Sequence, residues 1–105
     1  MNNVKTSDML ERAWLKVDKV GAQDGFVIAR ASLFDGTTFE LALPETEYED
    51  QGPDVPGLVK VGYVGDTAGV SEVVLPRPAL KFGYTVRVKP SSLVHWALYN
   101  KKKAT

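Results

Sequence analysis

Short segments in which apolar and polar residues alternate, separated by glycine and proline, run through most of this chain. The clearest pair is 25–34 (GFVIARASLF) and 37–43 (TTFELAL), which flank Asp35 and Gly36. An Asp-Gly pair between two such segments is a strong hairpin signal, because a type I′ turn needs positive φ at both central residues. Pro44 ends the second segment, since proline offers no amide to a sheet. We therefore predict an antiparallel hairpin with a type I′ turn.

Three later segments are also predicted to be strands: 58–64 (LVKVGYV), 70–76 (VSEVVLP) and 82–89 (FGYTVRVK), with a turn at 65–69 (GDTAG). Short strands at this spacing, separated by Gly and Pro turns, favour a small barrel or sandwich over a fold of alternating strands and helices. We predict a single mainly β domain over 1–105: a small antiparallel barrel or strongly rolled sheet of five to seven strands with a short N-terminal helix.

The order of these segments, ending in GYTVRVKPSSLV, is similar to small five-stranded barrels of the OB or Src-homology-3-like type. This is a likeness of architecture, and a shared architecture carries no function with it.

The N-terminal stretch shows two patterns at once. Its hydrophobic residues lie at helical spacing: Met9, Leu10, Ala13, Trp14, Val17 and Val20. Asp8 and Glu11 suit a helix start, yet WLKVDKV is rich in valine and leads toward the next strand. We predict a short helix over 7–13 followed by a strand over 14–20, with a single helix over 7–20 as the alternative.

The C-terminal stretch is similarly divided. Leu93, Trp96 and Ala97 have helical spacing, whereas Val94, Trp96 and Leu98 alternate as in a strand. We predict a turn at 90–93 and a strand over 94–99 that helps to close the core, then a frayed basic tail over 100–105. A helix over 91–100 is the alternative.

The strand patterns also predict which side chains are buried. The predicted core residues are Trp14, Val17, Phe26, Ile28, Phe39, Leu41, Val59, Val61, Val73, Leu75, Tyr84, Val86 and Val88.

Composition excludes several classes of protein. Hydrophobic residues make up 44% and charged residues 25% of the chain, which is typical of a globular domain. The absence of cysteine excludes disulfides, thiolate metal sites and cysteine nucleophiles, and it fits a reducing compartment. No apolar run is long enough for a secretory signal or a membrane span. We expect a cytoplasmic protein.

The net charge of zero hides a separation of charges along the sequence. From Asp35 to Asp54 the charged residues are all acidic, and after Glu72 they are all basic. Much of the acidity falls in a long Pro/Gly loop predicted over 44–57, and long loops are often functional or mobile. One interpretation is that the two sets form separate faces; the other is that neighbouring strands neutralise one another.

Catalytic and metal-binding motifs are weak. His95 is the only histidine and has no nucleophile motif near it, so a structural role is favoured over acid–base catalysis. The acidic residues lack the spacing of a calcium loop, and GYVGDTAG (62–69) lacks the spacing of a phosphate-binding loop. We predict no catalytic residue, no metal site and no cofactor.

The remaining function is a non-catalytic binding module that docks onto another protein or onto itself as a homo-oligomer, through acidic and basic faces. The candidate binding residues are Glu45, Glu47, Glu49, Asp50, Arg87, Lys89, His95, Lys101 and Lys102. Membrane partners are not expected.

Two alternatives stay open. The first is single-stranded nucleic-acid binding through Phe82, Tyr84 and the basic residues of 81–103, because barrels of this kind stack bases on aromatic side chains. The alternation of Phe82 and Tyr84 with Val86 and Val88 makes them better candidates for the core. The second alternative is a small-molecule binding protein or enzyme with a pocket in the barrel mouth.

Overall fold

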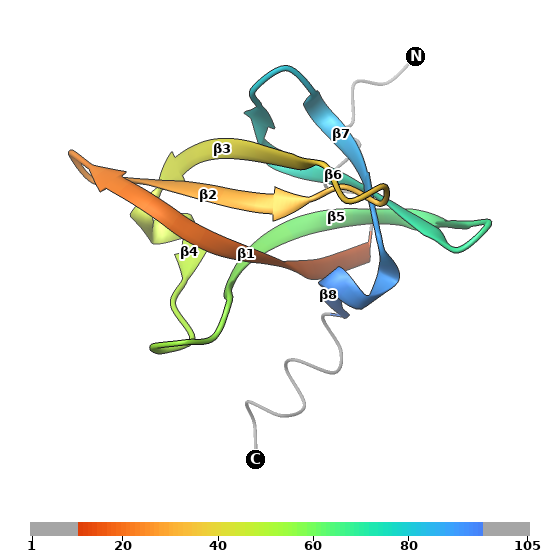
Figure 1. Cartoon of the computed structure of the whole chain (residues 1–105), viewed down its shortest axis with the longest axis horizontal. Helices are drawn as coiled ribbons and strands as arrows, with labels where there is room; N and C mark the ends of the chain where they lie inside the picture. Colours follow the sequence, from red (N-terminus) through yellow and green to blue (C-terminus); the bar gives the residue numbers. More distant parts are fainter. Residues whose placement is uncertain (1–10, 96–105) are drawn as a thin grey trace.

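The computed structural model of the chain describes residues 11–95, which form one curled antiparallel sheet (Figure 1). The elements along the chain are β1 (Glu11–Gln23), β2 (Phe26–Ser32), β3 (Thr38–Pro44), the 3-10 turn η1 (Glu45–Glu47), β4 (Tyr48–Glu49), β5 (Gly57–Thr67), β6 (Val70–Ala79), β7 (Gly83–Val88), the 3-10 turn η2 (Pro90–Ser92) and β8 (Leu93–His95). The strand order is β3-β2-β1-β5-β6-β7; β4 pairs with β5, and β8 pairs with β1. The sheet forms a half-barrel of six strands, which confirms the mainly β, rolled architecture.

The predicted N-terminal helix is wrong where the structure describes it. Residues 11–13 are the start of β1, which runs without a break through the predicted strand 14–20, so a single helix over 7–20 is also wrong. Ala13, Leu15 and Val17 are buried on one side of this strand. Pairing with β5 and β8 supplies backbone hydrogen-bond partners on both sides, and this tertiary pairing outweighs the local helical spacing. Residues 7–10 lie outside the described residues.

The predicted hairpin is confirmed, but its turn type is wrong. β2 pairs with β3 from Phe26↔Pro44 to Ser32↔Thr38. Gly36 has a φ of 92°, whereas Asp35 is not among the described residues with positive φ. The Gly36 amide donates to the Leu33 carbonyl at 3.0 Å and the Leu33 amide donates to the Thr37 carbonyl at 2.7 Å, which closes a longer loop with a single left-handed glycine.

The Asp35 side chain explains this turn. Its carboxylate accepts hydrogen bonds from the Thr37 amide at 3.0 Å and the Thr37 hydroxyl at 2.7 Å, which fixes the local backbone. The pKa of Asp35 is lowered because both hydrogen bonds favour its charged form. The type I′ pattern occurs instead at Asp24-Gly25, with φ values of 53° and 82°, between β1 and β2.

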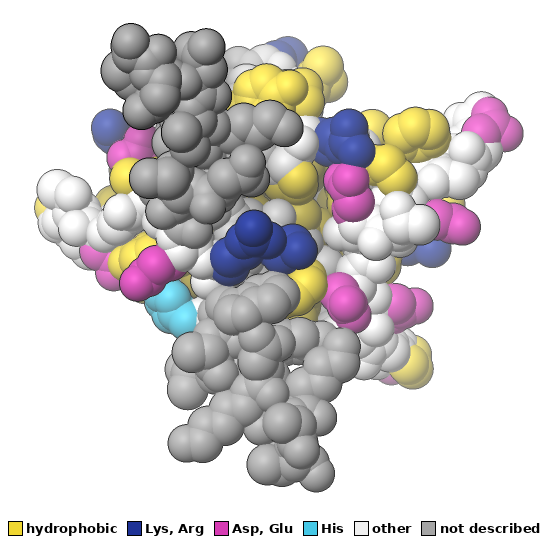
Figure 2. All heavy atoms as spheres, turned by 180° about the vertical axis from the view of Figure 1, so that it is seen from behind, with side chains coloured by type: hydrophobic (Ala, Val, Ile, Leu, Met, Phe, Trp, Pro, Cys, Tyr) yellow, Lys and Arg dark blue, Asp and Glu magenta, His cyan; other side chains and the backbone are white. Residues whose placement is uncertain are grey.

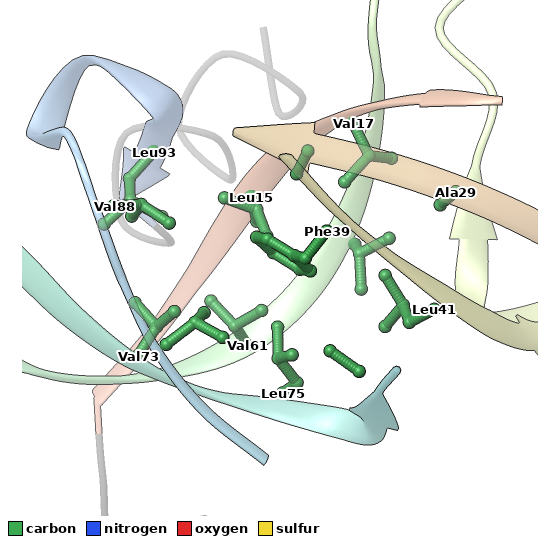
Figure 3. Close-up of a cluster of buried hydrophobic side chains, with 14 of the residues drawn as sticks. Leu15, Val17, Ala29, Phe39, Leu41, Val61, Val73, Leu75, Val88 and Leu93 are labelled. Carbon is green, nitrogen blue, oxygen red and sulfur yellow. The ribbon is translucent and has the colours of Figure 1, made fainter. Parts of the chain in front are cut away.

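The core lies inside the curl of the sheet, where side chains from β1, β2, β3, β5, β6, β7 and β8 meet (Figure 3). Most of the predicted core is confirmed as buried: Trp14, Val17, Phe39, Leu41, Val59, Val61, Val73, Leu75, Val86 and Val88. The prediction of burial is wrong for Phe26 and Tyr84, whose side chains are 49% and 54% exposed. Ile28 is only half-buried.

The face of β2 that enters the core is the opposite of the predicted one. Val27, Ala29 and Ala31 are buried, and their cross-strand neighbours on β3 are the buried Leu43, Leu41 and Phe39. Small alanines directly opposite large side chains fill the interior without overpacking, and this complementarity of volume selects the alanine face of β2.

The C-terminal prediction is confirmed in outline. The turn at 90–92 is η2, and the strand that follows is β8, so the described part of the predicted helix 91–100 is not an α-helix. The core side chain of β8 is Leu93, while Val94 is half-buried. Trp96, Leu98 and the predicted tail over 100–105 lie outside the described residues.

The two faces of the hairpin predict different responses to the same substitution. Phe39→Ala removes a buried ring and is expected to lower the free energy of unfolding by about 3–5 kcal/mol. Phe26→Ala removes a half-exposed ring on the neighbouring strand and is expected to cost less than about 1.5 kcal/mol. Urea denaturation followed by circular dichroism measures both, and an equal loss for the two variants contradicts the assignment of the faces.

Candidate functional site

The predicted binding residues do not gather into one site. Glu45 and Glu47 lie on η1, Glu49 on β4, Asp50 just after it, Arg87 on β7, Lys89 just after it and His95 on β8. Lys101 and Lys102 lie outside the described residues. In Figure 1, β4 lies on one side of the molecule and β7 and β8 on the other, so the structure separates the acidic candidates from the basic ones.

The predicted acidic loop is partly built into the sheet. Tyr48 and Glu49 form β4 and pair with Val59 and Leu58 of β5. The Tyr48 ring lies directly over Gly57, where any side chain would collide with it. Because Gly57 has no side chain, the Tyr48 ring can pack against it, and this contact holds the start of β5 against β4.

Glu47 is a structural clamp rather than a free acidic group. Its carboxylate accepts two hydrogen bonds from Arg77 of β6, from Nε at 3.1 Å and from Nη2 at 2.6 Å. This bidentate pair raises the pKa of Arg77 and joins η1 to the end of β6. A second ion pair joins Arg30 and Glu40 across β2 and β3, at 2.6 Å.

These two ion pairs show that the separation of charges along the sequence is only partly kept in the folded structure. Both neutralise an acidic residue of the 35–54 run with an arginine, as the interpretation of mutual neutralisation expects. Figure 2 shows acidic and basic side chains interspersed on one face of the molecule. Glu49, Asp54, Lys81 and Arg87 form no ion pair within residues 11–95, so part of the charge stays unneutralised there.

The aromatic side chains at the start of β7 are exposed, which the alternation did not predict. Phe82 is 43% exposed and Tyr84 is 54% exposed, although Val86 further along the same strand is buried. The Phe82 ring meets the buried Phe39 ring edge-on, with centroids 6.3 Å apart. β7 is the last strand in the sheet order, and its residues 83–85 are exposed. In the sequence, Lys81 directly precedes Phe82, and Arg87 follows Tyr84 by three residues.

A second exposed apolar region lies where the β6–β7 connection crosses β3. It is a groove with an apolar lining and a charged rim, formed by Ile28, Leu41, Ala42, Pro78, Ala79 and Leu80 with Glu40, Arg77 and Lys81. The Leu80 amide donates to the Glu40 carbonyl at 3.0 Å, which holds the connection against the edge of β3. The Leu80 side chain is 69% exposed. We call this region the apolar groove.

The sequence held one signal for this groove that our prediction did not use. The segment PRPAL (76–80) places two prolines and a leucine at the end of a strand. Prolines interrupt the pairing of β6 with β7, whose register shifts between Val74 and Ala79, and the freed backbone arches toward β3. The sequence alone does not show that this segment meets β3, because β3 is distant from it along the chain.

His95 lies beside a small polar cluster on β5 and β6. Its ring packs edge-on against Tyr63, with centroids 5.0 Å apart. The Asp66 carboxylate accepts hydrogen bonds from the Ser71 hydroxyl, at 2.5 Å, and from the Tyr63 hydroxyl. Both bonds lower the pKa of Asp66, the bond from Ser71 more than the bond from Tyr63. The bond to Asp66 raises the pKa of Tyr63.

The hydrogen bond between Asp66 and Ser71 links β5 to β6. Asp66 and Ser71 are cross-strand partners just past the bulge in β5 between Tyr63 and Gly65. The described partner of the Ser71 hydroxyl is Asp66, and His95 contacts the Tyr63 ring, so serine and imidazole are not arranged as nucleophile and base.

The comparisons with known proteins leave the function to be argued from geometry. A scan against protein-family models, a search of curated proteins and a search of solved structures each found no match. Among residues 11–95 no group of three or more His, Cys, Asp or Glu side chains is placed to hold a metal ion. No helix within the same residues is long and apolar enough to cross a membrane.

The hydrogen bond from Ser71 predicts a shift in the titration of Asp66. Because the folded pKa of Asp66 is below its ordinary value, this carboxylate stabilises the fold above about pH 4, and the contribution is lost as pH falls through the lowered pKa. Ser71→Ala is expected to raise the pKa of Asp66 toward the ordinary value, measured by NMR titration of the side-chain carboxyl. Ser32→Ala, an exposed serine on β2, is the control. An unchanged Asp66 pKa in Ser71→Ala contradicts the assignment.

Proposed function

We propose that this chain is a non-catalytic binding module that docks onto protein surfaces, including that of another copy of itself. The observation that carries the proposal is the apolar groove, because Leu80 is left 69% exposed beside a largely apolar lining. Contact with water is unfavourable for such a surface, and grooves of this kind commonly mark sites of association.

The surroundings of the groove fit this role. Glu40 and Arg77 at the rim are held in ion pairs with Arg30 and Glu47, so they do not need a partner to be neutralised. An apolar centre with a polar rim is the usual anatomy of a protein interface. Lys81 adds a positive charge that has no ion pair within the described residues.

Two further parts of the proposal rest on composition and architecture. The proposed location is the cytoplasm, which fractionation of the source cells tests. The proposed relation to OB-like or Src-homology-3-like barrels is one of architecture, and it supports a small β scaffold that presents its edges and loops for binding.

Self-association is the direct test of the proposal. We expect the mass measured by light scattering to exceed that of the 11.5 kDa monomer and to rise with protein concentration at low salt. A mass that stays at the monomer value up to millimolar concentration contradicts self-association.

A second candidate function is single-stranded nucleic-acid binding at the start of β7. The observation that favours it is the exposure of Phe82 and Tyr84 next to Lys81, since each base stacked on an aromatic ring contributes about 1–3 kcal/mol. It ranks second because the chain carries no net positive charge to attract phosphates.

Titration with a single-stranded oligonucleotide at two salt concentrations tests this second function. Binding is expected to weaken with salt and to fall about tenfold or more in Tyr84→Ala, while Phe26→Ala, an equally exposed aromatic on β2, leaves it unchanged. No salt-dependent binding at low ionic strength dismisses nucleic acid as the ligand.

A further inference from the structure

We infer that the occupant of the apolar groove is the 50–56 loop of a second copy of this chain, which joins copies head to tail. This inference rests on the proposed function and names its partner. It is carried by three observations: an exposed apolar side chain on an acidic loop, an apolar groove with Lys81 at its rim, and the separation of the two on one molecule.

The loop presents Val55 as an exposed apolar side chain. Val55 is 51% exposed and lies between Asp54 and Pro56. The Asp50 carboxylate accepts a hydrogen bond from the Gly52 amide at 2.9 Å, which closes a local turn at the base of the loop. A loop shaped in advance by this turn and by prolines loses little conformational freedom on binding, so its contacts count more fully toward affinity.

The charges of the loop and the groove are complementary. Asp54 forms no ion pair within residues 11–95, and neither does Lys81 at the groove rim. Asp18 and Lys19 of β1 border the loop and offset each other in charge, so the loop keeps a negative balance. Inserting Val55 between the apolar walls would bring Asp54 of one copy toward Lys81 at the groove rim of the other.

The arrangement of the fold prevents a molecule from filling its own groove. In Figure 1 the loop that precedes β5 projects at the lower left, whereas the β6–β7 connection lies at the top of the view. The two surfaces are different patches of the chain, so the contact between copies is heterologous. Such contacts build a ring where the rotation closes and an open chain where it does not.

The apolar part of the contact is expected to dominate its strength. Losing one buried valine side chain corresponds to about a tenfold or larger change in the dissociation constant. Losing one exposed ion pair corresponds to about a twofold to fivefold change. Added salt is therefore expected to weaken the association only slightly, and substitutions at Val55 or Leu80 to weaken it strongly.

The experiment is sedimentation velocity of the full chain and of three variants. Val55→Asp disrupts the loop, Leu80→Asp disrupts the groove, and Val64→Asp is the control because Val64 on β5 is a valine of matched exposure, 47% against 51%. We expect Val55→Asp and Leu80→Asp each to raise the dissociation constant about tenfold or more and Val64→Asp to leave it unchanged. Circular dichroism checks that each variant is folded, and Val55→Ala and Leu80→Ala replace any that is not.

Mixing the two disrupted variants gives the decisive result. The Leu80→Asp chain keeps an intact loop and the Val55→Asp chain keeps an intact groove, so their mixture is expected to form one-to-one dimers that do not grow. A mixture no heavier than either variant alone overturns the inference.

The outcomes also separate this inference from the proposed function. If the wild-type chain associates but Val55→Asp associates equally well, the loop is not the occupant, while self-association still holds. If the wild-type chain is a monomer at every concentration, the inference and the self-association part of the proposed function are both overturned, whereas docking onto a different protein is not.

Discussion

The pairing of β1 with three other strands is the interaction on which the rest of the fold depends. The first part of β1 pairs with β5 on one side and with β8 on the other, and the last part pairs with β2. The partner changes between Val17 and Asp18, and a register shift follows between Lys19 and Gly21, an irregularity of the kind that bends a strand. One strand thus connects the β2–β3 hairpin to the β5–β7 meander, and its curvature turns a flat sheet into a half-barrel whose inner face is buried.

Within residues 11–95, the half-barrel leaves β3 and β7 at the two ends of the strand order, each with one edge that pairs with no other strand. Edge strands invite association unless something covers them. Here each edge is held at one point by a backbone hydrogen bond: the Leu80 amide donates to Glu40 of β3, and the Phe34 amide donates to Arg87 of β7. The first of these contacts places the β6–β7 connection against β3 and creates the apolar groove. The hydrogen bond that holds the edge of β3 therefore belongs to the residue whose side chain is exposed, Leu80. This links the stability of the sheet to its proposed binding surface.

Folding also decides which charged side chains near the groove are neutralised. The sequence separates acidic from basic residues, but folding brings Glu47 to Arg77 and Glu40 to Arg30. Exposed ion pairs of this kind contribute little stability, so their main effect is to position η1 and β3 around the groove. For the contact that we propose, the charges outside these ion pairs are Asp54 on the loop and Lys81 on the rim. Apolar contact then supplies most of the affinity, and charge sets the orientation.

Much of the fold could be read from the chain alone, because alternation with period two and turn residues are local properties. The strands after residue 14, the β2–β3 hairpin and most core positions were predicted in this way, as was the turn before Leu93. Local pattern does not say which face of a strand meets the interior. The choice of Val27, Ala29 and Ala31 over Phe26 and Ile28 depends on the large side chains opposite them on β3.

The candidate site depended still more on tertiary structure. Phe82 and Tyr84 share an alternation with the buried Val86 and Val88, but they lie at the start of β7, where the strand is exposed. The apolar groove is made by residues far apart in sequence, and the acidic and basic candidates lie apart because the sheet curls between them. The sequence by itself determined where strands form and where the chain turns, since those follow from the residues nearby. Tertiary structure decided which side chains are covered and which remain exposed for a partner, because burial depends on what the rest of the chain places opposite them.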